Sequence, residues 1–377
     1  MSDGRGELSV DERYMRRALD LAERGWGRVA PNPMVGAVVV RDGRVVGEGY
    51  HAEFGGPHAE VAALRAAGAD AAGATLYVNL EPCHHTGKTG PCSQEIVQAG
   101  VARVVCAQAE TNPGARGGGV WLQEQGVEVE LGVLQREARD LNAVHETMFE
   151  RRRPFLALKY ALSLDGRLSE RPGAATRVTS GPAIQEAHRL RAGHDAVMVG
   201  IGTVLADDPQ LTVRGSVQPR VPPLRVVVDS NLRTPRTSRL AETASDAGVQ
   251  VFAADDVPDE RAAVLEARGV TVTRVGRAPG GLDLGAVLAS LGDAGIRSTL
   301  CEGGGRLGSA FLAAGLVDRL YLFIAPRIFG EPGVRGFQGD RGAAPGQWRT
   351  IRVRQLGSTT LLVMGPGDEP DPEDEHV

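Results

Sequence analysis

The stretch from Pro57 to Cys92, which reads PHAEVAALRAAGADAAGATLYVNLEPCHHTGKTGPC, decides how the first part of the chain folds. Its opening, Pro57–Ala67, is rich in alanine and is followed by glycine, which predicts a helix. The apolar run Ala74–Leu80 predicts a buried strand. A second helix is expected from Pro91 to Gly100, because proline favours the first turn of a helix and glycine its end. This order of elements is typical of an α/β domain.

The residues on either side of this stretch continue the alternation of strands and helices. The apolar runs Gly36–Val40 and Val45-Val46 are separated by a turn that contains Asp42-Gly43, which predicts a tight β-hairpin. The runs Val101–Ala107 and Val127–Val133 predict two further strands. Because the links between these elements are short, we expect an α/β sandwich with a largely parallel sheet.

A second α/β domain is expected after the charged run Arg151-Arg152-Arg153-Pro154, because 377 residues suit two domains better than one. Its strands are expected at 155–161, 195–200, 224–229, 249–254, 270–275, 299–301 and 320–325, with a closing strand at 360–364. Its helices are expected at 182–191, 259–268, 285–293 and 306–313. We therefore predict domains over residues 1–150 and 151–367 and an acidic, disordered tail over residues 368–377.

Composition excludes several classes of function. The net charge is −5, and without the six acidic groups of the last ten residues the chain has 42 basic and 41 acidic residues. This balance disfavours a dedicated nucleic-acid-binding protein. No apolar run is long enough for a membrane span, and residues 1–17 do not resemble a secretory signal. The four cysteines are too few for a disulfide scaffold, so we expect a cytoplasmic protein that acts on small molecules.

One imidazole and two thiols form the first candidate site. His58 lies at the start of the predicted helix, Cys83 follows a strand, and Cys92 starts the next helix. Zinc prefers this donor set, and three protein ligands leave a fourth position for water, whose pKa bound zinc lowers toward neutrality. Glu60 can take the water proton and pass it to a leaving amine. The pattern is that of zinc nucleobase deaminases.

The spacing of the two cysteines departs from the usual deaminase form, in which two residues separate them. Here eight residues lie between Cys83 and Cys92. In an alternative interpretation, His58 caps a helix and the cysteines are buried apolar residues. The occurrence of all four residues in this order makes that alternative the weaker one. The other two cysteines, Cys106 and Cys301, lie in apolar runs and are expected in the core.

The chain resembles the bifunctional deaminase/reductase family of riboflavin biosynthesis over residues 11–365. In the first half the resemblance is carried by Pro31-Asn32-Pro33-x-Val35-Gly36, Glu48-Gly49-Tyr50-His51, His58-Ala59-Glu60 and Leu80-Glu81-Pro82-Cys83-x-His85-x-Gly87-Lys88-Thr89-x-Pro91-Cys92. In the second half it is carried by Lys159, Ser163-Leu164-Asp165-Gly166-Arg167, Val204-Leu205-Ala206-Asp207-Asp208-Pro209 and Glu302-Gly303-Gly304. The long cysteine spacing is similar to that of this family.

The resemblance implies a cytidine-deaminase-like domain followed by a dihydrofolate-reductase-like domain. The first would remove an amino group hydrolytically from a diaminopyrimidinone that carries a phosphoribosylamino group. The second would use NADPH to reduce the ribosyl group of the product to ribityl. The family's contacts with the deaminase substrate fall here on Asn32, His51, His85 and Lys88.

A glycine-rich turn forms the second candidate site. Gly303, Gly305 and Gly308 follow an apolar strand and open a helix, where free backbone N–H groups can hold a phosphate. A plain strand–helix turn explains the same pattern, and its late position excludes the usual Rossmann arrangement. The resemblance implies a dinucleotide phosphate cradle formed by Gly304, Gly305, Arg306, Leu307, Gly308, Ser309 and Ala310.

The resemblance also implies other contacts in the second domain. Further NADPH positions are Ala161, Arg177, Thr203, Asp207 and Ser230. Substrate positions are Lys159, Ala175, Arg191, Leu211, Arg214 and Glu302, with the two arginines on the sugar phosphate. Arg177 and Ala175 stand where the family commonly has an aromatic residue and a serine.

Two points stay open at the level of sequence. Lys159 or Asp165 could assist opening or protonation of the ribose, although Asp165 in Asp-Gly is also a typical turn residue. Competing functions are a zinc deaminase of free nucleosides or tRNA, which predicts no NADPH binding, and a non-catalytic binding protein, which predicts no zinc. Glycine-rich α/β domains of this kind often self-associate, so we also expect a homo-oligomer.

Overall fold

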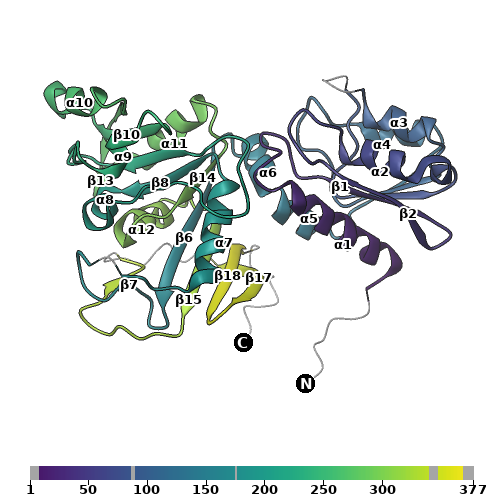
Figure 1. Cartoon of the computed structure of the whole chain (residues 1–377). Helices are drawn as coiled ribbons and strands as arrows, with labels where there is room; N and C mark the ends of the chain where they lie inside the picture. The colour runs from purple at the N-terminus through teal and green to yellow at the C-terminus, as the bar shows by residue number, and fades with distance from the viewer. Residues whose placement is uncertain (1–7, 86–89, 175, 339–346, 368–377) are drawn as a thin grey trace, which may run out of the picture. The chain divides into compact units, whose positions relative to one another are not determined.

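The computed structural model describes residues 8–85, 90–174, 176–338 and 347–367 (Figure 1). The chain separates into two compact units, Met1–Arg152 and Arg153–Val377, each of which has its own main sheet. The predicted acidic tail, residues 368–377, lies outside the described residues. Within them, every helix is too short or too polar to cross a membrane.

The first unit is built on a five-stranded sheet in the order β2-β1-β3-β4-β5. The strands are β1 Gly36–Arg41, β2 Arg44–Tyr50, β3 Thr75–Val78, β4 Arg103–Cys106 and β5 Glu128–Leu131. β3, β4 and β5 are parallel, but β1 is antiparallel to both β2 and β3. The antiparallel pairing of β1 with β2 is the predicted hairpin, whereas the expectation of a largely parallel sheet is wrong for the pairing of β1 with β3. The chain leaves the hairpin and crosses to the far side of β1, so β2 and β3 flank a strand of opposite direction.

Helices cover both faces of this sheet. They are α1 Val10–Ala22, α2 Ala59–Ala67, α3 Cys92–Gln98, α4 Gly118–Glu124, α5 Gln135–Leu141 and α6 Ala143–Glu150. Successive residues of a strand point to opposite faces. Accordingly Val39 packs in a core with α2, α3 and α4, whereas Val38 packs in a second core with α1 and α5. The predicted α/β sandwich is confirmed as three layers.

Two glycines let α2 lie close against the sheet, which matters because α2 carries His58 and Glu60. A Cβ atom on Gly47 would lie 2.3 Å from the carbonyl oxygen of Ala63, and one on Gly49 would lie 2.6 Å from that of Ala59. Any larger residue on this part of β2 would push the helix away. The hairpin before it is as predicted, with Asp42 and Gly43 both in the left-handed region at φ 50° and 73°.

The second unit is built on a nine-stranded sheet in the order β11-β10-β9-β8-β14-β6-β15-β18-β17. These strands are β6 Phe155–Ser163, β8 Ala196–Gly200, β9 Leu224–Val228, β10 Val249–Ala254, β11 Thr271–Val275, β14 Ser298–Cys301, β15 Arg319–Ala325, β17 Trp348–Leu356 and β18 Thr359–Pro366. Two small ribbons pair β7 Arg167–Ser169 with β16 Val334–Arg335, and β12 Arg277–Ala278 with β13 Gly281–Leu282. The helices are α7 Gly181–Ala192, α8 Ile201–Asp207, α9 Arg239–Glu242, α10 Asp259–Glu266, α11 Leu284–Asp293 and α12 Gly305–Ala313.

The position of β14 in this sheet is what assembles the second site. Although β14 comes late in the chain, it pairs in parallel with both β6 and β8. The residues that follow it therefore lie beside Lys159 of β6 and beside the connection that leaves β8. The predicted closing strand is confirmed as β18, but the edge of the sheet is β17, which the sequence did not predict. A register shift between Thr350 and Arg352 interrupts the alternation that would have revealed it.

Candidate active sites

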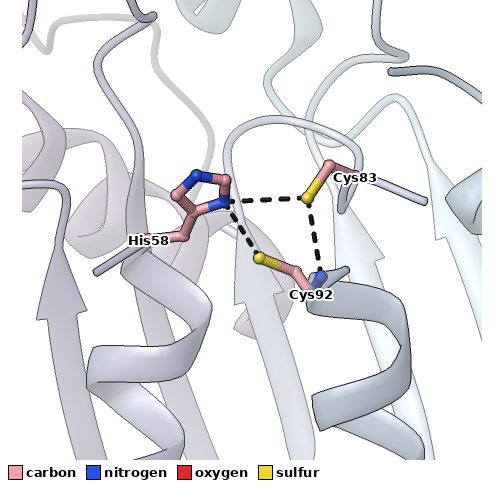
Figure 2. A group of neighbouring side chains, drawn as sticks. All are labelled: His58, Cys83 and Cys92. Carbon is pink, nitrogen blue, oxygen red and sulfur yellow. Dashed lines mark hydrogen bonds between the residues drawn. The ribbon is translucent and has the colours of Figure 1, made fainter. Parts of the chain in front are cut away.

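Three predicted zinc ligands converge in the first unit (Figure 2). His58 is the residue before α2, Cys92 is the first residue of α3, and Cys83 lies in the connection after β3. Their ligand atoms all lie within 4.8 Å of one another. His58 Nδ1 is 3.1 Å from Cys92 Sγ and 3.6 Å from Cys83 Sγ. Within the described part of the chain, this is the one such cluster of His, Cys, Asp or Glu.

The two thiols of this cluster differ in their pKa values because they lie close together. Cys92 and His58 donate to the Cys83 sulfur, which lowers the pKa of the Cys83 thiol to about 4. The pKa of Cys92 is raised, because its thiol shares a proton with Cys83 and is buried. The Cys92 backbone N–H, at the start of α3, also points at Cys83 Sγ, at 3.5 Å. Two thiols and an imidazole that compete for protons in this way are the donor set that zinc prefers.

Glu60 lies in the first turn of α2 and is buried beside these ligands. Burial, and the negative charge of Cys83, raise the pKa of its carboxyl group. A carboxyl group whose pKa is raised can both accept and return a proton, as general acid–base catalysis requires.

Asn32 and His51 also lie at this site. The ring of His51 is 5.6 Å from that of His58, and its Nδ1 lies 2.9 Å from the carbonyl oxygen of Pro57. A carbonyl accepts, so Nδ1 carries the proton and Nε2 accepts from Asn32 Nδ2 at 3.1 Å. Burial lowers the pKa of His51, which favours this neutral form. His85 is described and exposed, whereas Lys88 lies outside the described residues.

Sequence reasoning missed the buried polar residues that hold these segments. The Glu81 carboxylate accepts from the backbone N–H groups of Glu110, Gly117 and Gly119 at 3.0, 3.2 and 2.9 Å. These hydrogen bonds fix the backbone at Glu81, two residues before Cys83. Asn142 holds the Met34 backbone through both amide atoms, near Asn32. An acidic residue beside Pro-Cys in an apolar context was the one available signal for Glu81.

In the second unit, the structure brings together three predicted residues that lie far apart in the sequence. Arg191 on α7 binds Glu302, which follows β14, through Nε at 2.5 Å and Nη2 at 2.9 Å. Lys159 Nζ on β6 lies 3.7 Å from Glu302 and 5.5 Å from the centre of the Phe323 ring. Burial alone would raise the pKa of Glu302, but the charges of Arg191 and Lys159 lower it to about 2. Burial lowers the pKa of Lys159.

A fourth ionisable residue, His188, joins this cluster and was not predicted. It lies on α7, and its Nδ1 accepts from the backbone N–H of Arg214 at 3.1 Å. Arg191 Nη1 binds the carbonyl oxygen of Thr212 at 2.9 Å, so two side chains of α7 hold the segment that carries Arg214. Leu211, also predicted to contact the substrate, is buried with φ 55°.

The glycine-rich turn follows β14 as predicted, with Gly304 as the residue before α12. Two of its glycines are required by packing. A Cβ atom on Gly305 would lie 2.5 Å from the carbonyl oxygen of Arg335, and one on Gly308 would lie 2.0 Å from the hydroxyl of Tyr160. A Cβ atom on Gly304 would lie 3.7 Å from Thr203 Oγ1, its nearest neighbour. Gly304 and Thr203 therefore face each other where α8 and α12 begin.

The remaining residues of the expected cradle divide between protein contacts and the surface. Leu307 packs against the core, and Ser309 Oγ accepts from the backbone N–H of Gln338 at 2.7 Å. Arg306 and Ala310 are exposed. Packing alone therefore explains the glycines at positions 305 and 308, whether or not the start of α12 binds a phosphate.

The other predicted cofactor and substrate positions lie on separate elements. Ala161 is on β6, Asp207 ends α8 and has a pKa raised by burial, and Ser230 follows β9. Arg177 is exposed, and its carbonyl oxygen accepts from Arg327 Nη1 at 2.8 Å. Ala175 lies outside the described residues.

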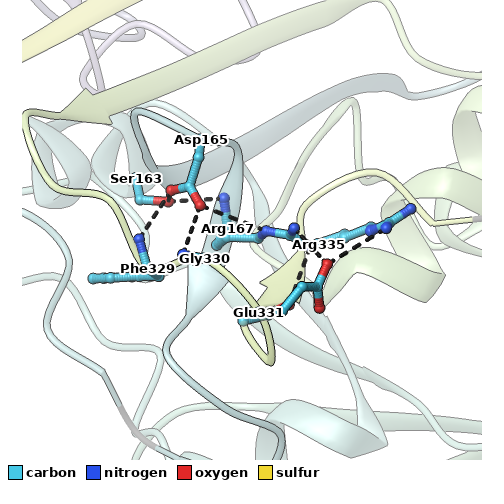
Figure 3. A network of polar contacts seen from close by, with 8 residues as sticks. Ser163, Asp165, Arg167, Phe329, Gly330, Glu331 and Arg335 are labelled. Carbon is cyan, nitrogen blue, oxygen red and sulfur yellow. Dashed lines mark hydrogen bonds and ion pairs between the residues drawn. The ribbon is translucent and has the colours of Figure 1, made fainter.

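Asp165 occupies a turn between β6 and β7 (Figure 3). Its carboxylate accepts from Ser163 Oγ at 2.6 Å and from the backbone N–H groups of Phe329 and Gly330 at 3.1 and 2.8 Å. These hydrogen bonds, that of Ser163 foremost, lower the pKa of Asp165 to about 2. Of the two interpretations of Asp165, the geometry favours the turn residue, because its oxygens are already used to join two segments of the backbone.

Comparisons with known proteins match the two units of the chain to two different families. Residues 8–108 match the family described as cytidine and deoxycytidylate deaminase zinc-binding region. Residues 154–362 match the family described as RibD C-terminal domain. The riboflavin biosynthesis protein RibD of Aquifex aeolicus is 42% identical over 355 residues, which cover 94% of this chain and 98% of that protein.

Solved structures show the same likeness. RibD of Acinetobacter baumannii is 36% identical, with a TM-score of 0.78 over 96% of this chain and 100% of that one. The diaminohydroxyphosphoribosylaminopyrimidine deaminase/5-amino-6-(5-phosphoribosylamino)uracil reductase of Thermotoga maritima is also 36% identical. Its TM-score is 0.79, over 95% of this chain and 99% of that one.

Proposed function

The chain belongs to the RibD family of riboflavin biosynthesis proteins, and from this premise we propose which of its residues carry the two activities. The protein is a bifunctional deaminase and reductase, with a zinc-binding deaminase region and a RibD reductase domain that uses NADPH. We assign deamination to residues 1–150 and reduction to residues 151–367. The single observation that supports the first assignment best is the convergence of His58, Cys83 and Cys92 beside the buried Glu60.

In the deaminase site, His58, Cys83 and Cys92 would hold the zinc ion. Bound zinc is a Lewis acid that lowers the pKa of water, so that hydroxide is available near neutral pH. Glu60 takes the proton as the water oxygen adds to the amino-bearing carbon of the pyrimidine. It then delivers a proton to the amino nitrogen, the carbon–nitrogen bond breaks and ammonia leaves.

Asn32 and His51 orient the pyrimidine in this proposal. Since the Asn32 amide nitrogen donates to His51, its carbonyl oxygen is left to accept from an N–H group of the substrate. His85 and Lys88 complete the contacts, with Lys88 directed at the phosphate by analogy with the family.

In the reductase site, NADPH supplies the hydride. Reduction of the ribosyl group to ribityl would break the bond between the anomeric carbon and the ring oxygen, and the ring oxygen would then need a proton. We assign the delivery of this proton to Lys159, because it is buried beside Glu302 and Asp165 is occupied in its turn. Glu302 holds the ammonium group and is itself held by Arg191, and Leu211 and Ala175 complete the contacts with the substrate.

The nicotinamide cofactor is assigned to the region around the start of α12. Gly304 and Thr203 face each other there, and the exposed Arg306 lies in the first turn of α12. The other positions assigned to NADPH are Ala161, Arg177, Asp207, Ser230, Gly305, Leu307, Gly308, Ser309 and Ala310. Arg214 is assigned to the substrate phosphate, which a guanidinium group can bind through two parallel hydrogen bonds.

Two broader properties are part of the same proposal. We place the protein in the cytoplasm, which agrees with its four free cysteines and with the small-molecule substrates proposed above. We also propose a homo-oligomer, which the edge strand β17 supports because it carries the exposed Val353. Sedimentation equilibrium of the purified chain tests this: a mass near 39.7 kDa at micromolar concentration would contradict it.

Incubation with the diaminopyrimidinone ribosyl phosphate, with and without NADPH, tests the assignment of activities. Mass spectrometry should detect deaminated product without NADPH, and deaminated and reduced product with it. Reduction of the substrate before deamination would overturn the order of steps. A metal content well below one zinc ion per chain would overturn the assignment of the ligands.

A further inference from the structure

The segment that carries Arg214 has an irregular backbone. Residues 208–223 contain neither helix nor strand, and they connect α8 with β9. Leu211 has φ 55°, which is unfavourable for a residue with a branched side chain, and Gly215 has φ 135°. A backbone of this kind keeps one conformation only where contacts from outside the segment hold it.

Helix α7 supplies those contacts from one face. His188 and Arg191 are three residues apart, so their side chains lie on the same side of the helix. Arg191 Nη1 donates to the carbonyl oxygen of Thr212, and His188 Nδ1 accepts from the N–H of Arg214. A Cβ atom on Gly215 would lie 3.9 Å from the Cβ of His188, so the segment packs directly on this side chain.

The hydrogen bond to Arg214 defines the state of the His188 ring. A backbone N–H donates, so Nδ1 carries no proton and the neutral ring has its proton on Nε2. Three charged groups face the ring: Arg191 from α7, Arg214 from the segment, and Glu302 from the connection after β14. Burial and the two arginines lower the pKa of His188, which keeps the acceptor available at neutral pH.

We propose that His188 is a positioning residue of the reductase. By accepting the N–H of Arg214, it fixes the backbone from which the Arg214 guanidinium group reaches the phosphate of the substrate. The ring itself does not touch the reacting atoms. This inference rests on the proposed role of Arg214, and it adds a residue that acts on phosphate recognition through the backbone.

The test uses the full-length enzyme, NADPH and two substrates: the deaminated ribosyl phosphate and the same compound without its phosphate. The variants are His188→Ala, His188→Asn, Arg214→Ala and the double variant His188→Ala/Arg214→Ala. Gln185→Ala, on an exposed position of the same helix, is the matched control. Deamination by each preparation reports on the integrity of the chain.

His188→Ala should raise KM for the phosphorylated substrate about five- to tenfold, the effect of one lost hydrogen bond, and leave kcat within about twofold. KM for the substrate without phosphate should not change. His188→Asn should restore KM, because Asn Oδ1 can take the place of Nδ1. The double variant should be no worse than Arg214→Ala, since both changes act through the same contact.

The outcomes separate this inference from the function on which it rests. If Arg214→Ala raises KM for the phosphorylated substrate but His188→Ala does not, the role of His188 is wrong and that of Arg214 stands. If Arg214→Ala leaves KM unchanged, the phosphate contact is wrong and the inference falls with it. Equal losses on both substrates, or no rescue by His188→Asn, would show general damage and would also overturn it.

Discussion

The two sites of this protein are assembled in different ways. The deaminase ligands lie within 35 residues of sequence, with His58 and Cys92 at the starts of α2 and α3 and Cys83 in the connection between them. The reductase cluster joins Lys159, Arg191 and Glu302, which come from three distant elements and meet because β14 is inserted between β6 and β8. The first site can be recognised as a motif, whereas the second exists only once the sheet has formed.

The two sites also differ in their charges. The first site brings two thiols and an imidazole together, and the pKa of the Cys83 thiol is lowered while that of the Cys92 thiol is raised. In the second site one carboxylate, Glu302, lies beside two cations, Arg191 and Lys159, so one positive charge is left over. The first site therefore offers the donor set that a metal ion needs, whereas the second offers a positive charge to an anionic ligand.

Glu60→Gln is the sharpest test of the independence of the two sites. We expect deamination to fall by about 10²–10⁴, because the proton-transfer group is lost while the ligands remain. The zinc content per chain, measured by elemental mass spectrometry, should not change. Reduction of pre-deaminated substrate should proceed at the wild-type rate, and a parallel loss of reduction would contradict two independent sites.

Lys159→Met makes the reciprocal change in the second site. We expect reduction to fall by at least about 10², because the proposed proton donor is removed. The Glu302 carboxylate keeps its contacts with Arg191. The rate of deamination, measured as the release of ammonia, should not change. A wild-type rate of reduction would exclude Lys159 as the proton donor.

The pH dependence of stability should report on Glu302. Its pKa is about 2 in the folded protein against an ordinary value of 4.5. A depressed native pKa gives stability that is present above pH 4.5 and is lost as the pH falls toward 2, by up to about 3 kcal/mol. Glu302→Gln should lower stability at pH 7 and flatten this acid limb in thermal unfolding of the second unit. An unchanged acid limb would show that the ion cluster is not the cause.

Gly308→Ala and Gly304→Ala form a matched pair within the glycine-rich turn. A Cβ atom on Gly308 would clash with the Tyr160 hydroxyl, so we expect the variant to lose about 1–3 kcal/mol of stability. Adding Tyr160→Phe should recover part of this loss, because the hydroxyl is the nearest atom. Gly304→Ala meets nothing closer than 3.7 Å and should unfold like the wild type. Equal losses in denaturant unfolding would contradict the packing role of Gly308.

The sequence predicted the elements that carry short-range signals. The hairpin at Asp42-Gly43, the helix after His58 and the strands of the main sheet of the second unit other than β17 have clear turn residues or apolar runs, and their outlines agree with the structure. The short helices α4, α5 and α6 were not predicted. α4 begins in a run of glycines, α5 is rich in charged residues, and the buried residues of α6 are polar, so α5 and α6 give no apolar stripe.

The residues that hold the sites were harder to predict than those that form them. His188, Glu81 and Asn142 act through hydrogen bonds to backbone groups 20 or more residues away. Such contacts depend on where the chain returns, and neither composition nor periodicity encodes that. The antiparallel pairing of β1 with β3 was also missed, because hairpin and crossover signals indicate which elements follow one another but not which strands become neighbours.

The late position of β14 has a consequence for how the protein is made. On the ribosome, the five strands of the first sheet are all available once residue 131 has emerged, so the deaminase unit can fold early from its own sequence. The reductase sheet lacks its central strand, β14, until residues 298–301 are synthesised. Until then the edges of β6 and β8 that β14 will cover can pair with other strands. A nascent chain can therefore hold all five strands of the first sheet while β6 and β8 of the second still lack the strand that lies between them.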